Sequence, residues 1–430
     1  MKFLITRSKL FIILCILCHI MATNSLLHSR SRKSDKFSLE YALIFKKLWT
    51  FDPNHLGYDA YKETLKLGYP AEKHVVETKD NYLITILRIP RGKNLTDTNE
   101  SRPVVILSPA LFCTAACYTD RGPETSLSYL LVDAGYDVWI VNHRGTTFSR
   151  SHVLYDPIKD KQFWDFSWHE LGTLDLTATI DYALNLTEQN QASVVSFSQG
   201  TTAMFVMLAE LPEYNEKIKV AFALGPSAFV DHTPLNSPIR KFLANSDHLE
   251  KLTTMLKMYG VYPHTEEISQ PIMKLCNFNS TDEQLAVCNF ELDIVVGHPQ
   301  EQIDPRNIAQ IISHYPGGAS VRQLKHYNQL FQTGRFARFD YGKLLNKRIY
   351  GQEESPLYNL KNIQAPIYLM YGDGDVYVMP EDVKNLHRQL NNSKLFLVNY
   401  PPFSHLDFLY ARDVKELVYD YIIEILNKYY

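Results

Sequence analysis

The chain has 430 residues, of which 45% are apolar and 12% aromatic, and its formal net charge at pH 7 is −3. That length supports one large core, or one core that carries an insertion. The nearly neutral charge argues against nucleic acid as the main partner, and no run of like charges indicates an interaction tail.

The N-terminus has the composition of a secretory signal peptide. Lys2, Arg7 and Lys9 flank an apolar run over residues 10–21, and small residues follow it. The alternative is a membrane anchor, but the run is shorter than the roughly 20 residues that span a bilayer. We therefore expect cleavage of residues 1–25. No later segment is long and apolar enough to span, so the sequence predicts a secreted or lysosomal protein without an integral membrane span.

Four of the six cysteines lie beyond the signal peptide, at Cys113, Cys117, Cys276 and Cys288. In an oxidising compartment they allow three pairings. We favour Cys276 with Cys288, which closes a short loop, whereas Cys113 and Cys117 could pair or stay free. No Cys-x-x-Cys sequence or clustered histidine accompanies them, so no metal site is predicted.

Five Asn-x-Ser/Thr sequences are candidate glycosylation sites, as expected of a secreted protein. They are Asn94, Asn99, Asn185, Asn279 and Asn391. Each such sequence by itself occurs at chance level, so the prediction that these asparagines are glycosylated depends on the prediction that the protein is secreted.

The mature chain begins with a leader and N-terminal segment, residues 26–67, which is basic and Ser-rich at first and then partly helical. A turn at 68–70 follows it. A strand pair is expected over 73–77 and 82–89, joined at 79–81.

Strands and helices then alternate along the chain. Strands are expected over residues 104–107, 137–141, 193–197 and 219–224, and helices over 126–133, 171–184 and 201–208. Alternation of this kind predicts an α/β fold, with a mostly parallel sheet covered by helices on both faces.

The alternation stops near residue 228 and resumes near residue 357. The last elements expected are strands over 367–371 and 395–398 and a helix over 414–428. We therefore predict an α/β core in two parts, residues 68–227 and 358–430, with an inserted cap over residues 228–357. Ligands bind at the carboxyl ends of the strands in such sheets, and the cap would cover them.

The strongest candidate for chemistry is Ser198, at the tip of a strand-to-helix turn. An apolar run ends at Phe197, and Gln199-Gly200 opens a packed helix. This is the context that the nucleophile elbow, G-x-S-x-G, requires. The turn would lift the serine hydroxyl above the sheet and place the N–H groups of the helix beside an oxyanion. Ser196 holds the first glycine position, and an ordinary turn is an equal alternative, so the serine needs partners.

A base and an acid must accompany a serine nucleophile. In this fold the acid follows the serine and the histidine follows the acid, each at the end of a strand. Asp373 and Asp375 follow the strand over 367–371, and His405 comes directly after the last strand. Alone, each could be a turn carboxylate or a surface-loop histidine, but their order and placement predict a triad. Triad chemistry needs no metal and no organic cofactor.

Several aromatic-rich strings point to one family. They are Gly-Tyr-Pro at 68–70, Ala-Gly-Tyr-Asp-Val-Trp at 134–139, Asn-His-Arg-Gly at 142–145, Phe-Trp-Asp-Phe-Ser at 163–167, Ser-Gln-Gly-Thr-Thr at 198–202 and His-Leu-Asp-Phe at 405–408. With them the chain resembles the acid lipase family, which includes gastric lipase and lysosomal acid lipase, over about residues 68–419. The resemblance implies an α/β-hydrolase fold with a mainly helical lid that covers the site until lipid binds. It also implies hydrolysis of triacylglycerols or steryl esters through an acyl-enzyme.

Site residues follow from the resemblance by position. It implies Ser198 as nucleophile, Asp375 as acid and His405 as base. It prefers Asp375 to Asp373, because the segment at 380–383 is typical of the family. The partners it implies are a lipid substrate and the lipid–water interface, while the oligomeric state stays open.

The same resemblance implies an oxyanion hole from the backbone N–H groups of Gln199 and Ala110, and a cap disulfide between Cys276 and Cys288. Two N–H groups are what an oxyanion hole needs.

Two dipeptides beside the site depart from the family pattern. Ser108-Pro109 replaces His-Gly before Ala110, and Ser196-Phe197 replaces Gly-His before the nucleophile. Proline donates no hydrogen bond and fixes φ near −65°. The donor at Ala110 can survive that change, but a left-handed glycine position could not. The alternative is therefore a catalytically weak or inactive lipid-binding or storage protein on the same fold.

Three lesser features have simpler interpretations. A cysteine nucleophile at Cys113 or Cys117 would lack an elbow and an assigned base. The aromatic string over 163–168 is expected to pack beneath the active-site loops rather than bind lipid, and Arg144 is expected to form a structural ion pair.

Overall fold

The computed structural model describes residues 46, 49–95, 101–277, 279–285, 288 and 302–430. The predicted signal peptide and the candidate glycosylation site Asn99 lie outside these residues. Within the described part of the chain, no helix combines the length and apolar character that crossing a bilayer requires.

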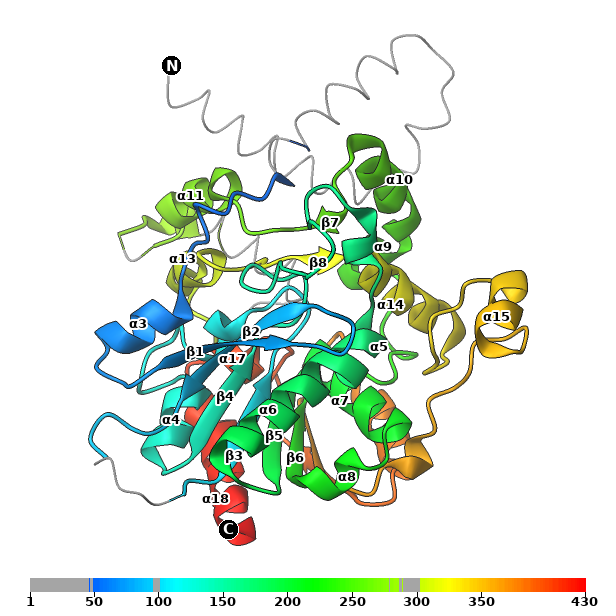
Figure 1. The fold of residues 1–430 in the computed structure, drawn as a ribbon. Coiled ribbons are helices and arrows are strands. Elements are labelled where there is room, and N and C mark those ends of the chain that lie inside the picture. Colours follow the sequence, from blue (N-terminus) through cyan, green and yellow to red (C-terminus); the bar gives the residue numbers. More distant parts are fainter. Residues whose placement is uncertain (1–45, 47–48, 96–100, 278, 286–287, 289–301) are drawn as a thin grey trace, which may run out of the picture.

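A central sheet of eight strands organises the protein (Figure 1). Its order is β1-β2-β4-β3-β5-β6-β9-β10. The strands are β1 (Glu72–Glu77), β2 (Leu83–Ile89), β3 (Val104–Ser108), β4 (Asp137–Val141), β5 (Ala192–Phe197), β6 (Ile218–Leu224), β9 (Ile367–Tyr371) and β10 (Ser393–Leu397). Among them β2 runs antiparallel to both of its neighbours, and every pair from β4 to β10 is parallel. The predicted mostly parallel sheet is therefore confirmed, with strand ends within a few residues of the expected ones.

Helices cover both faces of this sheet. They are α3 (Ala60–Lys66), α4 (Leu127–Asp133), α5 (Trp168–Glu170), α6 (Thr177–Thr187), α7 (Gln199–Glu210), α8 (Tyr214–Lys217), α16 (Pro380–Gln389), α17 (Asp407–Tyr410) and α18 (Asp420–Tyr429). Successive side chains of a strand point to opposite faces. On β3, Ile106 packs in one core cluster with Phe205 of α7, and Leu107 packs in the other with Leu131 of α4. Strands buried on both faces explain the continuous apolar runs in the sequence.

Two of the predicted helices contain a π-helical segment. The helix expected over 171–184 begins as α5, continues as the π-helical Leu171–Leu176 and ends as α6. A Cβ atom at Gly172 would lie 2.3 Å from the carbonyl oxygen of Ala203 in α7, so this close approach requires glycine. The closing helix likewise begins with a π-helical segment, Lys415–Tyr419. Apolar spacing could not predict either segment, because it assumes 3.6 residues per turn.

The stretch between β6 and β9 forms helices, most of which lie above the sheet in Figure 1, while the last one projects to the side. They are α9 (Pro238–Ala244), α10 (Ser246–Leu256), α11 (Glu266–Leu275), α13 (Ile308–Ile312), α14 (Val321–Thr333) and α15 (Lys343–Tyr350). Phe112, in the loop after β3, has ring contacts with Phe242 of α9 and with Tyr262. This stretch therefore meets the carboxyl end of the sheet, although its predicted limits, 228–357, stay a prediction.

A second, two-stranded sheet joins β7 (Gly260–Val261) to β8 (Ala319–Ser320) within this stretch. It was not predicted, because strands of two residues show no readable periodicity.

Cysteines and candidate glycosylation sites occupy contrasting environments. Cys276 and Cys288 form a disulfide, the pairing favoured above, while Cys113 and Cys117 are free and buried. The four candidate glycosylation sites within the described residues are all exposed, as a glycan requires. They are Asn94, Asn185, Asn279 and Asn391.

Candidate active site

Ser198 lies between β5 and α7 in a strained backbone conformation. Its φ is 51° and its ψ is −117°, and a positive φ is uncommon for a residue with a side chain. Its N–H donates to the carbonyl oxygen of Leu224 at 2.9 Å, and its own carbonyl accepts from the N–H of Thr201 at 2.8 Å. The neighbouring strand and the first turn of α7 therefore hold the sharp turn that sequence reasoning expected. The side chain is half-buried.

Three predicted side chains from separate segments meet at this turn. Nε2 of His405 lies 2.8 Å from Oγ of Ser198, and Nδ1 lies 2.7 Å from Oδ2 of Asp375. The other carboxylate oxygen of Asp375 accepts from the N–H groups of Tyr377 and Val378 at 2.8 Å and 2.9 Å. We call Ser198, His405 and Asp375 the triad cluster. The arrangement lets the imidazole accept the serine proton while the carboxylate holds its other nitrogen.

The competing carboxylate, Asp373, lies elsewhere. It is exposed, whereas Asp375 is only 1% exposed. The carboxylate that the structure places against His405 is therefore Asp375, the one that the family resemblance preferred.

Glycines allow the loops that carry Asp375 and His405 to pack backbone against backbone. A Cβ atom at Gly372 would lie 2.2 Å from the carbonyl oxygen of Phe403, and one at Gly374 would lie 2.3 Å from that of Pro402. The N–H of Gly374 also donates to Phe403 at 3.0 Å. Gly225, with a φ of +56°, faces the imidazole, and a Cβ atom there would come within 2.9 Å of Cε1 of His405. The position of the imidazole therefore depends on glycines in two segments.

Aromatic rings enclose the imidazole on two sides. The ring of Phe197 lies 5.0 Å from that of His405, and the ring of Tyr377 lies 5.3 Å away. Phe197, at a position where the family resemblance implies a polar residue, therefore contributes an apolar wall beside the imidazole of His405. Ser196 turns its hydroxyl toward the sulfur of Met204 at 3.6 Å, so it fits against α7 at the position of the family's glycine.

The loop after β3 packs against the N-terminus of α7. A Cβ atom at Gly200 would lie 2.3 Å from the carbonyl oxygen of Ser108 and 2.9 Å from that of Pro109. The two predicted oxyanion donors, Gln199 and Ala110, therefore belong to adjoining segments. The N–H of Gln199 is among those that have no acceptor within their own helix.

The replacement of His-Gly in this loop is accommodated without strain at those positions. The Ser108 hydroxyl pairs with Nε2 of His143 at 3.0 Å, and its carbonyl accepts from the Tyr118 hydroxyl at 3.1 Å. The left-handed residue of this loop is Phe112, with a φ of 63°, and not Pro109. No glycine is therefore needed where proline stands.

The side chain of Gln199 connects the elbow to α14. Its Oε1 accepts from the amide nitrogen of Gln323 at 2.8 Å, and Gln199 is 3% exposed. Sequence reasoning missed Gln323, because the two glutamines are 124 residues apart and no motif contains the second one.

Asp407 is a second carboxyl near the triad cluster that sequence reasoning did not single out. The pKa of its carboxyl is raised to about 7. Burial is the main cause and the charge of Asp375 adds to it, while a hydrogen bond from the N–H of Ser404 acts in the opposite direction. That hydrogen bond is 2.7 Å long, and Asp407 is 1% exposed. Its position in the His-Leu-Asp-Phe string could have drawn attention to it.

Cys117 has the histidine neighbour that the sequence did not reveal. The Cys117 thiol faces His314, and Nε2 of His314 lies 2.8 Å from Oδ2 of Asp120. Burial alone would lower the pKa of His314, but its contacts with Asp120 and Cys117 raise it to about 10. We call Cys113, Cys117, His314 and Asp120 the thiol cluster. The sequence assigned no histidine to either cysteine, because His314 is almost two hundred positions away along the chain and only folding brings it to Cys117.

The thiol cluster nevertheless lacks access to substrate. Cys113 is 4% exposed and Cys117 is 3% exposed, and neither lies at a strand-to-helix elbow. Among the described residues, no group of histidines, cysteines and carboxylates is arranged to hold a metal ion.

The aromatic string and Arg144 are structural elements of the core. Phe163, Trp164, Phe166 and Trp168 are all buried. Arg144 is fully buried and pairs with Asp175 at 2.7 Å and with Asp80 at 2.6 Å. Both features match the simpler interpretation made from the sequence.

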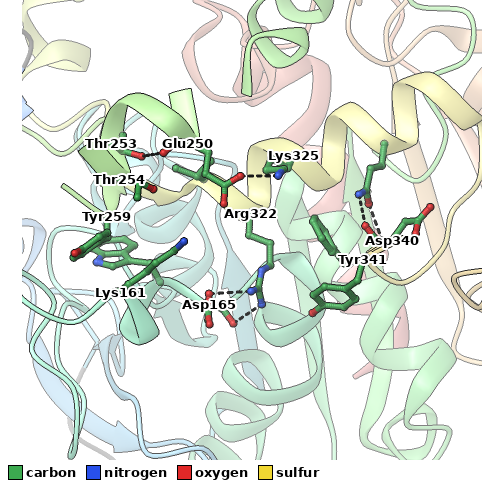
Figure 2. A pocket seen from close by; sticks show the side chains of 14 residues that line it. Lys161, Asp165, Glu250, Thr253, Thr254, Tyr259, Arg322, Lys325, Asp340 and Tyr341 are labelled. Atoms are coloured by element: carbon green, nitrogen blue, oxygen red, sulfur yellow. Dashed lines mark hydrogen bonds and ion pairs between the residues drawn. The ribbon is translucent and has the colours of Figure 1, made fainter. Parts of the chain in front are cut away.

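A separate pocket of about 300 Å³ lies between α10 and α14 (Figure 2). Its walls carry paired charges: Arg322 lies 2.9 Å from Asp165, and Lys325 lies 2.7 Å from Glu250. No side chain of the triad cluster lines it. The pocket is therefore not where the triad cluster would meet an ester.

Comparisons with known proteins agree on one family. Residues 63–122 match the partial alpha/beta-hydrolase lipase region, and residues 111–248 match the alpha/beta hydrolase fold. The second match confirms the predicted fold class.

Several lipases are similar to this chain over most of its length. It is 37% identical to Lipase 3 of Drosophila melanogaster over 365 residues, which is 84% of this chain and 91% of that protein. It is 36% identical to gastric triacylglycerol lipase of Bos taurus over 360 residues, 84% of this chain and 88% of that one. For the Homo sapiens protein of the same name the identity is 33% over 370 residues, with coverages of 84% and 89%.

Proposed function

Because the chain belongs to the acid lipase family of α/β-hydrolases, we propose that it is a secreted or lysosomal serine lipase that hydrolyses esters of neutral lipids. The substrates would be triacylglycerols or steryl esters. The family supports a lipase or esterase function in general. The observation that carries the specific proposal is the continuous chain of hydrogen bonds from Ser198 through His405 to Asp375, with the serine at a strained elbow.

The first half of the reaction would form an acyl-enzyme. Oγ of Ser198 attacks the ester carbonyl carbon while Nε2 of His405 takes its proton. When the carbon–oxygen bond breaks, the imidazolium gives that proton to the departing alcohol. Asp375 keeps the imidazole in the tautomer whose Nε2 can accept, and it stabilises the imidazolium.

The second half would regenerate the serine. His405 takes a proton from water, the hydroxide attacks the acyl carbonyl, and the proton returns to Ser198 as the fatty acid leaves. In both halves the negative charge develops on the carbonyl oxygen. The N–H groups of Gln199 and Ala110 are the proposed donors to it, as the packing of Gly200 on the loop after β3 supports.

Apolar surroundings favour a lipid substrate over a polar ester. Phe112 lies in the loop that supplies the second oxyanion donor, and its ring contacts those of Phe242, Tyr262 and Tyr315. An acyl chain would exchange water for this aromatic surface, which is favourable roughly in proportion to the apolar area buried.

The test uses an active-site-directed fluorophosphonate and a short-chain nitrophenyl ester. We expect the probe to label Ser198, as shown by peptide mapping, and Ser198→Ala to abolish both labelling and hydrolysis. Ser196→Ala is the matched control, because this serine lies two positions away with its hydroxyl directed at Met204. It should keep both activities.

The opposite result would support the alternative from the sequence. A correctly folded protein that binds fatty acid, ignores the probe and hydrolyses no ester would be a lipid-binding protein on this fold. Full hydrolysis by the Ser198→Ala variant would contradict the proposed nucleophile.

A further inference from the structure

Helix α15 projects from the side of the protein (Figure 1). Of its eight residues, only Asn346 is buried. Leu344 is 84% exposed, the highest value of any large apolar side chain among the described residues, and Leu345 and Ile349 are 47% and 54% exposed. Contiguous exposed apolar side chains mark an interaction surface more often than single scattered ones do.

The helix is held in place from its inner side. The amide nitrogen of Asn346 donates to Oδ1 of Asp340 at 2.7 Å and to the carbonyl of Glu353 at 2.9 Å, and its oxygen accepts from the N–H of Tyr341. The Tyr350 hydroxyl donates to the carbonyl of Phe339 at 2.9 Å. These bonds use the face toward the body, so the outer face is free while the helix stays formed.

Its root is anchored to the body of the protein. The guanidinium of Arg322 lies 5.5 Å from the ring of Tyr341, two residues before α15 begins, and Arg322 also pairs with Asp165 (Figure 2). The helix therefore projects from a fixed base.

The charges of α15 are all positive. Lys343, Lys347 and Arg348 lie within it, and it contains no acidic residue. Lys343 lies 3.9 Å from Glu353 at a highly exposed position, and Lys347 and Arg348 have no acidic partner among the described residues. Exposed pairs of this kind contribute little, so the cations are available to an anionic surface.

The aliphatic and cationic side chains are arranged as at a lipid surface. With about 100° between successive residues, Leu344, Leu345 and Ile349 share one arc. Lys347 lies about 60° beyond the Leu344 end of this arc, and Lys343 lies about 100° beyond it, toward the face that carries Asn346 and Tyr350. Arg348 falls within the arc, where its long stem can bury methylene groups while the guanidinium reaches outward.

We propose that α15 docks the protein onto anionic lipid surfaces, with Leu344, Leu345 and Ile349 entering the headgroup boundary and Lys347 and Arg348 facing the lipid charges. The relevance of this docking rests on the proposed lipase function, since a lipase meets its substrate at such a surface. A second copy of the chain is a poorer occupant, because it would bring the same cations against each other.

The test measures vesicle binding in the Ser198→Ala background, so that no lipid is hydrolysed. The probes are vesicles of phosphatidylcholine alone and vesicles of equal parts phosphatidylcholine and phosphatidylglycerol. We expect the protein to sediment with the mixed vesicles, and added salt to weaken this binding. Leu344→Ser with Leu345→Ser should weaken it by about tenfold, and Lys347→Ser with Arg348→Ser by about tenfold on mixed vesicles only.

Matched control variants replace exposed leucines or exposed cationic side chains at other positions on the surface. Leu65→Ser with Leu186→Ser removes two leucines that are 43% and 47% exposed. Lys62→Ser with Lys66→Ser removes two lysines that are 71% and 69% exposed on α3. Both control proteins should bind vesicles like the parent.

Two outcomes would overturn the docking proposal. One is equal vesicle binding by the parent and both α15 variants. The other is a change from dimer to monomer in sedimentation caused by the α15 substitutions, which would make α15 an interface between copies. Failure of the lipase proposal is separate: it would show as no hydrolysis of the soluble ester by the unmutated protein, whatever the vesicles show.

Discussion

The triad cluster and the thiol cluster each combine a nucleophilic side chain, a histidine and an aspartate, and they differ most in how far the nucleophile is exposed. The triad cluster has a His–Asp distance of 2.7 Å and the thiol cluster one of 2.8 Å. Ser198 is half-buried at a strained elbow before a helix, whereas Cys117 is 3% exposed in a 3₁₀ turn (Ala115–Tyr118) within a core cluster. A set of suitable side chains is therefore not enough; the nucleophile must also be open to substrate beside an oxyanion donor.

Electrostatics separates the two clusters as well. In the thiol cluster the contacts of His314 with Asp120 and Cys117 raise the pKa of the imidazole to about 10, against the effect of its burial. Burial raises the pKa of the Cys117 thiol, but its hydrogen bonds with Cys113 and His314 lower it to about 6, so charge pairing holds this cluster together inside the core. The thiol cluster therefore has the features of a structural ion pair.

The largest expected effect distinguishes the two histidines. His405→Ala removes the proposed base and should lower kcat/KM for a soluble nitrophenyl ester by about 10⁴-fold or more. His314→Ala should leave kcat/KM within about threefold, because the residue lies outside the reacting groups. It should instead lower the free energy of unfolding by about 3–5 kcal/mol, since Asp120 is left buried without its partner. Equal loss of activity in both variants, with His314→Ala still folded, would place the thiol cluster in the reaction.

The next effect concerns pH and Asp407. In the folded protein its carboxyl keeps a proton up to about pH 7, whereas its ordinary pKa is 3.8. The folded state therefore binds the extra proton between these values, and stability should fall as pH rises through that window. We expect a loss on the order of 3 kcal/mol between pH 4 and pH 8, measured by urea unfolding at several pH values.

Asp407→Asn is the matched variant for this measurement. It should remove that part of the pH dependence, because the amide does not titrate, while it can still accept from the N–H of Ser404. An unchanged pH profile in the variant would assign the dependence to other groups.

A smaller effect is expected at Gly225, which borders the imidazole. Gly225→Ala adds a Cβ atom within 2.9 Å of His405 at a positive φ. The imidazole must shift, and kcat should fall by about tenfold. Gly122→Ala is the control, because Gly122 also has a positive φ, of +77°, but no heavy atom lies within 4 Å of the added Cβ. Both should lose about 1 kcal/mol of stability, so a similar fall in kcat for both would contradict a positional effect.

The smallest effects belong to the free thiols. Cys113 and Cys117 should react with a thiol-specific reagent at under about a tenth of the rate seen in urea, because they are buried in the folded protein. Cys117→Ser should change kcat by less than about twofold. Fast labelling that also stops ester hydrolysis would show that the loop after β3 opens to solvent and controls the site.

Much of the fold could be predicted, because strands and helices with long regular patterns identify themselves locally. The strands from β1 to β10 of the large sheet and the serine turn were expected at nearly their observed positions. The π-helical Leu171–Leu176 and the short β7–β8 pair were missed, since neither follows a periodic pattern.

The sequence by itself determined the order of the three side chains, the strand ends that carry them and the family of the chain, because each depends on neighbouring residues or on aligned strings. Only the tertiary structure decided which groups surround them. It brought Gln323 to Gln199, His314 to Cys117 and Gly225 to the imidazole of His405. Such contacts join residues far apart in the chain, and packing and burial rather than local propensity select them.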